Sequence, residues 1–394
     1  MRILILGGTG FIGKAIFYTL ISKKEHEIFI GSRSQIEGYK NWKKIDFAAT
    51  NNFEEILQNI DLVINAIGII EGDFENVQAN SPLKLYTICK QKSIKIINIS
   101  AVGAEKEEPP TDFLRSKKTA DEFILTQTNG KVIYPGIVLG EGGQSSKFFK
   151  EISTLPLIPL PDDKPLPFVH ITQLTGLIEQ VINNYDDFPA QIFAVSEPQK
   201  MSEVLSFLRK GKSRFLPMPT SLMQLAFTVF PNLSLGIFNK NMFTLFTEIN
   251  AKDYKPIFDK ATNHLVGENI KASHSLLNLL VVFSIVFIWI GTGLVSLYSW
   301  DKSLELMSEI GVTNQYAGWF VIAGSLADIL LGVGMFFKSI RKNVLLLQLL
   351  FIVVYTIIIS ILAPQHWLHP FGPISKNIPL LALTFLTYKE QKSL

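Results

Sequence analysis

The sequence predicts a doubly wound parallel α/β domain followed by an all-α bundle of four transmembrane helices. Two observations predict the α/β part. Apolar strands alternate with amphipathic helical stretches, and the first strand runs into the glycine-rich segment 7–13. The bundle is predicted by the hydrophobic residues, 47% of the chain, which concentrate after about Leu276. The expected boundaries are an α/β domain over 1–215, an amphipathic linker over 216–270 and a membrane domain over 271–394.

Composition narrows the classes of function. The net charge of +3 over 394 residues is too small to predict nucleic-acid binding, and no basic patch with interleaved aromatic residues stands out. The one cysteine, Cys89, excludes an internal disulfide and a cysteine-based metal centre, and we expect no metal site. Because the chain starts directly with an apolar strand, we also expect no cleavable signal peptide.

The glycine-rich segment carries the clearest indication of a ligand. The apolar run Ile3–Leu6 predicts a buried parallel strand, and an amphipathic helix follows over 11–22. Gly7 would allow the tight turn between them, Gly10 would let backbone approach a pyrophosphate, and Gly13 would let helix pack on strand. The helix N-terminus attracts phosphates, and a tight turn without a ligand is the alternative. The predicted nucleotide contacts here are Gly7, Thr9, Gly10, Phe11, Ile12 and Gly13.

The end of the second strand indicates which nucleotide binds. This strand, Glu27–Ile30, is followed by Gly31-Ser32-Arg33-Ser34. An NAD site would place an acid near this point to bind the ribose 2′-hydroxyl, whereas the guanidinium of Arg33 suits a 2′-phosphate. We therefore expect NADP rather than NAD, and a solvated loop residue is the alternative role of Arg33.

The next three strand ends supply further candidate residues. Asp46, at the third, would accept a hydrogen bond from adenine or cap the following turn. Ala66 and Gly68, after the fourth, are small enough for a cofactor to lie across them. The fifth strand, over 95–99, delivers Ser100 at its carboxyl end, where open α/β sheets bind ligands.

Several motifs of the first 215 residues together resemble the short-chain dehydrogenase/reductase superfamily. The similarity is greatest to its extended or atypical branch, which includes NmrA-like proteins and an accessory subunit of respiratory complex I. The motifs that carry the resemblance are Gly7–Gly13, Asn80, Ser100-Ala101-Val102-Gly103, Phe113-Leu114-Arg115-Ser116-Lys117-Lys118, Tyr134-Pro135-Gly136 and Phe168-Val169-His170.

The resemblance implies a catalytic role for two residues and shows one departure. In that superfamily a serine orients the substrate carbonyl, and a lysine binds the nicotinamide ribose and lowers the pKa of a tyrosine four residues before it. Ser100 and Lys117 match these positions, but Phe113 stands where the tyrosine is expected, and a phenyl ring transfers no proton. Thr111, Tyr134 or a water molecule are alternative donors, and an exposed helix residue is the alternative for Lys117.

Two later features have open interpretations. His170, after the proline-rich loop 155–167, is either an acid/base group or a half-buried residue that bridges this loop to the helix from Ile171. The apolar stretch Leu222–Phe230 is too short to span a bilayer, so we expect a core helix or an interfacial one.

Four apolar stretches predict membrane spans, over 276–300, 316–337, 344–362 and 371–388. The loop 301–315 is acidic, whereas Lys271, Lys338, Arg341 and Lys342 flank the spans on the opposite side. The positive-inside rule then places both termini in the cytoplasm, with the chain as a multi-pass protein of the inner, cytoplasmic membrane.

The membrane half resembles the DoxX-like family of four-helix membrane domains. The matching residues are Trp289–Gly293, Ala327–Gly332, His369–Pro373 and Lys376–Leu380. DoxX relatives are linked to quinone-dependent redox chains. Asp328 would therefore contact a quinone or relay protons, or alternatively form a structural hydrogen bond between helices. Gly291, Gly293, Gly332 and Gly334 would permit close helix packing.

These features lead to two functional hypotheses. The first is a membrane-anchored, NADPH-dependent oxidoreductase that acts on a lipophilic or quinone-like substrate. The second is a catalytically inactive protein that binds NADP as a sensor or as an assembly subunit of a membrane complex. The partners expected are the lipid bilayer, a quinone or similar substrate, and a membrane-complex partner, with no nucleic acid.

Overall fold

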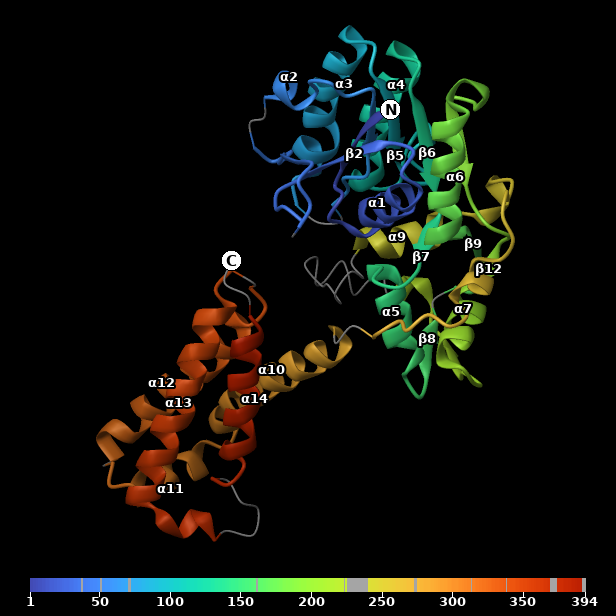
Figure 1. Cartoon of the computed structure of the whole chain (residues 1–394). Helices are drawn as coiled ribbons and strands as arrows, with labels where there is room; N and C mark the ends of the chain where they lie inside the picture. The colour runs from blue at the N-terminus through green and yellow to red at the C-terminus, as the bar shows by residue number, and fades with distance from the viewer. Residues whose placement is uncertain are drawn as a thin grey trace. The chain divides into compact units, whose positions relative to one another are not determined.

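The computed structural model divides the chain into two compact units, Met1–Ser273 and His274–Leu394 (Figure 1). We refer to them as the head and the bundle. The structure describes residues 1–36, 38–49, 52–69, 72–160, 162–222, 224, 240–272, 275–312, 314–337, 339–368 and 374–391.

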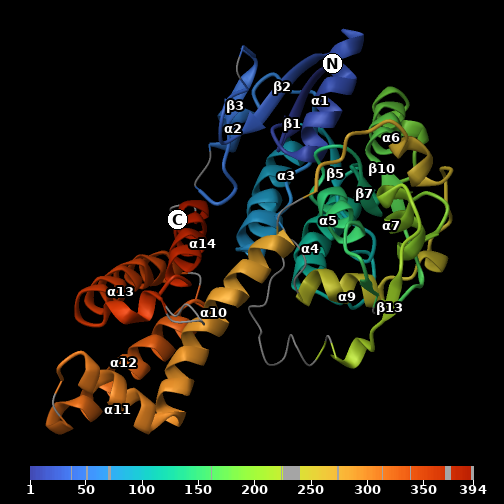
Figure 2. The same cartoon turned by 90° about the horizontal axis from the view of Figure 1, so that it is seen from below.

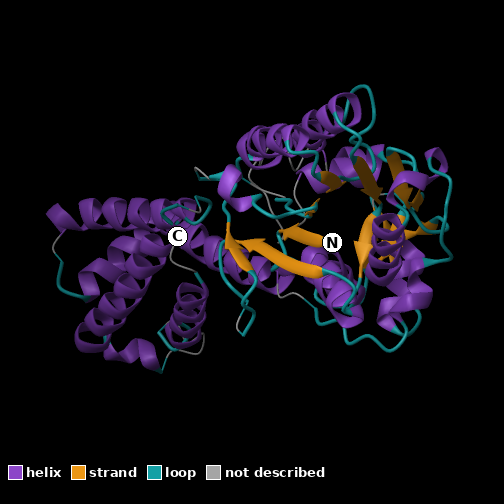
Figure 3. Cartoon of the chain, turned by 45° about the horizontal axis from the view of Figure 1, so that its top comes forward, coloured by secondary structure: helices purple, strands orange, loops and turns teal. Residues whose placement is uncertain are grey.

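A seven-stranded parallel sheet forms the centre of the head (Figure 3). The strand order is β11-β6-β5-β4-β1-β2-β3, so the chain reverses direction across the sheet between β1 and β4. This confirms the predicted doubly wound fold and puts the candidate ligand site at that switch point. The strands are β1 (Arg2–Leu6), β2 (Glu27–Ser32), β3 (Trp42–Lys44), β4 (Leu62–Asn65), β5 (Lys95–Ile99), β6 (Lys131–Pro135) and β11 (Gln191–Ala194).

Helices cover both faces of this sheet because successive side chains of each strand point to opposite sides. Ile3 and Ile5 of β1 join one core with α1 (Phe11–Lys23) and α6 (Ile171–Asn183). Leu4 and Leu6 join the other core. It is completed by α2 (Phe53–Ile56), α3 (Ser81–Gln91) and α4 (Asp112–Gln127). Burial on both faces explains why the strands are apolar throughout.

A third core builds a smaller lobe on the carboxyl side of the sheet. Its elements are α5 (Gln144–Ser153), α7 (Met201–Arg209), α9 (Lys240–Glu248) and the paired strands β7 (Ile137–Leu139) with β10 (Phe168–His170), β8 (Ile158–Leu160) with β13 (Phe215–Pro217), and β9 (Pro165–Leu166) with β12 (Gln199–Lys200). Short helical turns complete the head: η1 (Glu75–Asn80), η2 (Tyr185–Asp187), η3 (Ala251–Asp253) and η4 (Ala261–Leu265).

The segment 216–270, set apart in the sequence as a linker, contributes to the head. Phe243 and Phe246 of α9 are buried in the third core, and Ile249 and Tyr254 are buried in the core around α4. Helix α9 lies close to α4 and α5 in Figure 2. Most of the predicted core or interfacial helix Leu222–Phe230 lies outside the described residues.

The bundle consists of α10 (Ser275–Tyr298), α11 (Trp300–Glu309), α12 (Asn314–Gly334), α13 (Arg341–Leu362), η5 (Pro364–Trp367) and α14 (Asn377–Glu390). Among the described residues, three helices are long and apolar enough to cross a membrane: Asn278–Tyr298, Tyr316–Gly334 and Arg341–Leu362. Their large side chains face outward, as in Phe287 and Trp319, which are 69% and 73% exposed. Such exposure of aromatic residues suits a lipid environment.

Two details of the bundle correct the sequence prediction. The fourth predicted span is a helix of 14 residues, α14, whose length of about 21 Å is less than the hydrocarbon core. The acidic segment 301–315, predicted as a loop, contains the amphipathic helix α11. Of the glycines, Gly293, Gly332 and Gly334 do allow close packing, because an added Cβ would lie 2.6 Å from Ser325 O, 2.5 Å from Ile290 and 2.9 Å from Val344, respectively. Gly291 faces open space.

Candidate functional site

The turn between β1 and α1 depends on its glycines. Gly7 adopts a positive φ of 73°, and its carbonyl accepts a hydrogen bond from Gly10 N at 2.8 Å. A Cβ on Gly13 would lie 2.3 Å from that same carbonyl oxygen, so only glycine lets α1 approach the strand this closely. The predicted turn residues are therefore together at the switch point of the sheet.

The N-terminus of α1 is open to an anion. Its N-cap, Gly10, provides no side-chain cap, and the first turn contains no acidic residue. The first N–H groups of a helix have no intrahelical acceptor, and Thr9 and Gly10 are exposed. This cradle fits the pyrophosphate of a dinucleotide, which gains hydrogen bonds and the favourable end of the helix dipole.

Arg33 and Asp46 lie at the ends of the second and third strands, outside the pocket described below. Arg33 is exposed one residue after β2. Asp46 is half-buried after β3, and its Oδ1 accepts a hydrogen bond from Ala48 N at 3.1 Å, as the turn-capping alternative requires. The adenine and 2′-phosphate contacts of these residues stay predictions.

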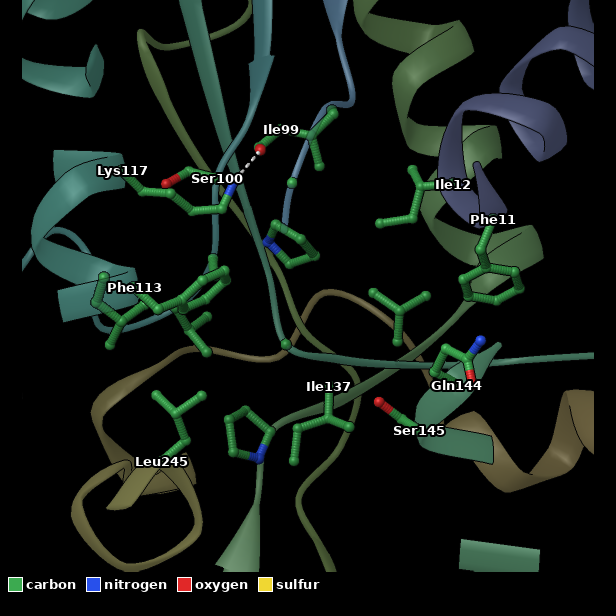
Figure 4. Close-up of a pocket in the computed structure, with 18 of the residues that line it drawn as sticks. Phe11, Ile12, Ile99, Ser100, Phe113, Lys117, Ile137, Gln144, Ser145 and Leu245 are labelled. Atoms are coloured by element: carbon green, nitrogen blue, oxygen red, sulfur yellow. Dashed lines mark hydrogen bonds between the residues drawn. The ribbon is translucent and has the colours of Figure 1, made fainter. Parts of the chain in front are cut away.

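A cavity of about 350 Å³ begins at the N-terminus of α1 and extends along the carboxyl ends of β4 and β5. In Figure 4, Phe11 and Ile12 lie on one side of it, and Phe113 and Lys117 on the opposite side. Its other lining residues include Ala66, Gly68 and Ser100 from the predicted set, together with Pro135, Ile137, Gln144, Ser145, Leu166, Pro167, Met242, Leu245 and Ile249.

Ser100 and Lys117 come together at the base of this cavity. Lys117 is 6% exposed, and its Nζ donates a hydrogen bond to Ile99 O at 3.0 Å. Burial lowers the pKa of Lys117 to about 8, although the carboxylate of Asp121 opposes this shift. The Phe113 ring lies 5.7 Å from Nζ, at the position where the resemblance implies a tyrosine. The exposed-lysine alternative for Lys117 is therefore wrong.

The bundle holds a second group of buried polar residues. Among the described residues, four of its buried side-chain atoms have no hydrogen-bond partner: Trp289 Nε1, Ser325 Oγ, Asp328 Oδ1 and Gln348 Oε1. Ser325 and Asp328 of α12 face α10 at Gly293. Gln348 of α13 donates to Leu331 O at 3.1 Å. No group of three or more candidate metal ligands occurs in the described part of the chain.

Family comparisons match both halves of the chain. Residues 3–121 match the NAD dependent epimerase/dehydratase family, and residues 286–385 match the DoxX-like family. The chain joins an epimerase-like NAD-binding domain to a DoxX-like domain. With its apolar helices, the DoxX-like domain identifies a membrane protein. A comparison with curated protein sequences finds no match.

Solved structures similar to the epimerase-like domain include a nucleoside-diphosphate-sugar epimerase from Staphylococcus aureus. It shares 17% identity with a TM-score of 0.53, over 70% of this chain and 99% of the other. UDP-glucuronic acid 4-epimerase from Bacillus cereus, solved in complex with NAD, shares 16% identity with a TM-score of 0.47, over 55% of this chain and 87% of the other. At these identities the likeness to the Staphylococcus aureus protein supports the fold alone.

A buried network behind Ser100 in the epimerase-like domain was not predicted from the sequence. Asp121, 1% exposed, accepts hydrogen bonds from Ser100 Oγ and from Asn98 Nδ2. Asn98 Oδ1 in turn accepts from Tyr86 Oη at 2.8 Å and from Asn65 Nδ2 at 3.1 Å. The available signal was the spacing of Lys117 and Asp121, which puts an acid on the same helix face one turn later.

The apolar wall from α9 was also missed. Met242, Leu245 and Ile249 line the cavity opposite the nucleotide turn. Their spacing of three and four residues indicates one helix face, but it does not reveal that this face covers a sheet more than 100 residues earlier in the chain. Because 216–270 was interpreted as a linker, these three residues were not expected to line the cavity.

The two side chains considered from the sequence as alternative proton donors, Thr111 and Tyr134, make other contacts in the domain. Thr111 is the N-cap of α4 and accepts a hydrogen bond from Leu114 N. Tyr134 is 1% exposed and stacks on Phe193, and burial raises the pKa of its hydroxyl. Neither residue lines the cavity.

His170 is a structural residue at the start of the helix from Ile171, as the alternative to catalysis expected, but its ring bonds to Glu268 rather than to the proline-rich loop 155–167. It caps α6, and its Nε2 lies 3.0 Å from Glu268 Oε1. Contrary to the expectation of a half-buried residue, its side chain is 1% exposed, and burial lowers its pKa to about 4. The neutral ring therefore links α6 to the segment around Glu268.

Proposed function

We propose that this protein is a membrane-anchored oxidoreductase that uses a nicotinamide nucleotide, preferentially NADPH, to reduce a lipophilic acceptor of the quinone class. The observation that carries this proposal is the continuity of one cavity. It runs from the nucleotide turn at Gly10 and Phe11, past Lys117 and Ser100, to the apolar wall of α9. Nucleotide, proton-carrying groups and acceptor would thus share one cavity.

The residues of the turn would hold the nucleotide. The N-terminus of α1 would bind the pyrophosphate, Ala66 and Gly68 would leave room along the strand end, and Lys117 would bind the nicotinamide ribose. Gly68 supports this arrangement, because a Cβ placed there would lie 3.7 Å from Lys117 Nζ. When bound, the reduced nucleotide supplies a hydride.

The far end of the cavity favours an apolar acceptor over a sugar. Its wall consists of Phe113, Leu166, Met242, Leu245 and Ile249, which offer hydrocarbon and one thioether. The hydroxyl groups of a sugar would lose their hydrogen bonds to water against these five side chains without gaining new ones, because the polar lining residues Gln144 and Ser145 lie on the Phe11 side of the cavity (Figure 4). A quinone ring or an isoprenoid chain would instead gain from its burial.

The experiment is a titration of full-length protein in detergent with NADPH and NADH, followed by addition of menadione as the quinone probe. We expect tight NADPH binding and loss of reduced-nicotinamide absorbance upon quinone addition. Lys117→Ala is expected to lower the rate about 100-fold, and Lys118→Ala is the matched control, because Lys118 bonds to the backbone of the loop 106–107. Absence of nucleotide binding, or a rate that survives Lys117→Ala, contradicts the proposal.

The preference for NADPH has its own test. Arg33 is exposed at the end of β2, where it would pair with the 2′-phosphate. Arg33→Ala should weaken NADPH binding about tenfold and leave NADH binding unchanged. Lys90→Ala, a charge change on the exposed surface of α3, should alter neither affinity. An equal loss of affinity for NADPH and NADH would contradict the proposed preference for NADPH.

A second candidate is a catalytically inactive, NADP-binding sensor or assembly subunit of a membrane complex. Phe113 favours this candidate, because the proton donor of the superfamily is missing. The two candidates differ in one measurement. Tight NADPH binding without oxidation, across several quinones and membrane lipid extracts, would favour the sensor.

We also propose that the protein lies in the inner membrane with both termini in the cytoplasm. The basic residues Lys271, Arg341 and Lys342 support this orientation, whereas α11 on the opposite side carries Asp301 and Glu305. A green fluorescent protein fused to the C-terminus should fluoresce, and an alkaline phosphatase fused there should be inactive. An active phosphatase would reverse the orientation.

A further inference from the structure

The cavity contains few groups that carry a proton. Among the described residues that line it, Lys117 is the one with an ionisable side chain, and Nζ is bound to Ile99 O. Phe113 stands in place of the usual donor. Ser100 adds a hydroxyl at the same base of the cavity, next to Lys117 in Figure 4. A hydroxyl alone is a weak acid, so its neighbours decide whether it donates.

The hydroxyl group of Ser100 is hydrogen-bonded to a buried carboxyl group. Its Oγ bonds to Oδ2 of Asp121, and the other oxygen, Oδ1, accepts from Asn98 Nδ2 at 2.7 Å. Asp121 does not itself line the cavity. A proton held on its carboxyl group therefore reaches the cavity through the Ser100 hydroxyl.

The rest of the network fixes this pair in place. Tyr86 donates to Asn98 Oδ1, so the amide must present Nδ2 to the carboxyl group. The ionisable groups that face Asp121 are Lys117 on α4, Tyr86 on α3, Tyr134 on β6 and Glu105 in the loop after β5. Of these, Lys117 favours the carboxylate and Glu105 opposes it.

We propose that Ser100 and Asp121 form a proton relay that replaces the missing tyrosine. The proposal rests on the proposed function, since it concerns reduction of an acceptor in this cavity. As the acceptor takes up a hydride, the Oγ–H bond of Ser100 breaks and a new O–H bond forms on the acceptor oxygen. The carboxyl proton of Asp121 passes from Oδ2 to Oγ, which leaves a carboxylate. Quinone, hydride and one proton together make the hydroquinone.

The relay returns to its starting state after the product leaves. A proton from the bulk solvent reaches the cavity through water. As it forms a new bond to Ser100 Oγ, the hydroxyl proton of Ser100 passes to Oδ2 of Asp121 along the same hydrogen bond. Burial supports this cycle, because it raises the pKa of Asp121 to about 6. The carboxyl group is then partly protonated near neutral pH, as a proton donor requires.

The first test needs no turnover. Infrared spectra of nucleotide-free, full-length protein should contain a C=O stretch of a protonated carboxylic acid that disappears as pH rises through about 6. This band should be weaker in Asp121→Asn than in the wild type, and the component lost there should be shifted in Ser100→Ala. It should be unchanged in Glu122→Gln, which alters the neighbouring carboxylate on the exposed side of α4. A band that ignores Ser100→Ala overturns the relay.

The second test uses the pH dependence of NADPH oxidation by menadione. The wild-type rate should fall as pH rises through about 6, because the carboxyl proton is lost. Asp121→Asn should lower the rate about 100-fold and remove this dependence. Phe113→Tyr in the Asp121→Asn background should restore the rate, since it returns a hydroxyl to the empty donor position, which a merely misfolded site would not permit.

The outcomes separate the relay from the proposed function. Binding of NADPH without turnover of any acceptor would refute the oxidoreductase and the relay with it. Normal turnover with an unchanged pH profile in Asp121→Asn would refute the relay alone and leave the oxidoreductase intact.

Discussion

Both compact units of the chain bury an aspartate among polar side chains, Asp121 in the head and Asp328 in the bundle. In the head, both carboxylate oxygens of Asp121 are hydrogen-bonded, to Ser100 and to Asn98. In the described part of the bundle, Asp328 Oδ1 has no hydrogen-bond partner, although the side chain is hydrogen-bonded to Thr292. Buried atoms of Trp289, Ser325 and Gln348 also lack a partner there. The first group is a completed network and the second is not.

The two groups therefore differ in how they contribute to stability. A buried polar atom without a partner loses its hydrogen bonds to water and gains none, whereas a satisfied network recovers most of that free energy. The head network therefore contributes to the stability of the folded head. The unpartnered atoms of the bundle group would recover that free energy by bonding to a water molecule, a proton or a polar ligand. Four substitution or pH experiments test this comparison, in order of decreasing effect.

The largest effect is expected for Asp121→Leu. The substitution removes the hydrogen-bond acceptor that Ser100 and Asn98 share in a buried site and the carboxylate that raises the pKa of Lys117. The free energy of unfolding should therefore fall by about 4 kcal/mol at neutral pH. Thermal unfolding of full-length protein in detergent, followed by circular dichroism, measures it. Glu122→Leu, at an exposed neighbouring position, is the control and should cost about 0.5 kcal/mol. Equal effects of the two variants would contradict a structural network.

The pH dependence of head stability should follow from the raised pKa of Asp121. The folded pKa is about 6 against an ordinary value of 3.8, so the folded state binds the proton more tightly than the unfolded state. This contribution is complete below pH 3.8 and is lost as pH rises through about 6, which corresponds to about 3 kcal/mol. Denaturant unfolding at several pH values should show this slope in the wild type and lose it in Asp121→Asn.

Close packing in the bundle gives a smaller effect. A Cβ on Gly293 would lie 2.6 Å from Ser325 O, so Gly293→Ala should push α10 from α12 and cost about 2 kcal/mol. Gly291→Ala, in the same helix but facing open space, should be neutral or slightly stabilising. Thermal stability in detergent distinguishes them, and identical behaviour of both variants would remove Gly293 from the helix contact.

The smallest effect is expected for Asp328→Leu. Because Oδ1 of Asp328 has no hydrogen-bond partner among the described residues, the substitution removes the hydrogen bond of this side chain with Thr292 but no completed network. It should therefore change the stability of the bundle by about 1 kcal/mol, in contrast to Asp121→Leu. The same thermal measurement provides the comparison. A loss as large as that of Asp121→Leu would mean that Asp328 is held by strong bonds and that the two groups are alike.

Local patterns determined the parts of this protein that were predicted correctly. Buried parallel strands are continuous apolar runs, so β1, β4 and β5 could be recognised in the sequence without knowledge of their neighbours. The glycine turn is also local, because Gly7 and Gly13 meet within one strand–turn–helix unit. The absence of a tyrosine at Phe113 needed only the motif around it.

Tertiary structure alone decided the features that depend on distant residues. Ser100 and Asp121 meet because β5 and α4 pack together, and the sequence distinguishes Asp121 from the exposed acid beside it only by helix face. The wall from α9 closes a cavity whose other side is formed near the N-terminus. Hydrophobic periodicity shows that a helix has a buried face, but it does not show what covers that face, because burial is non-directional and many partners satisfy it.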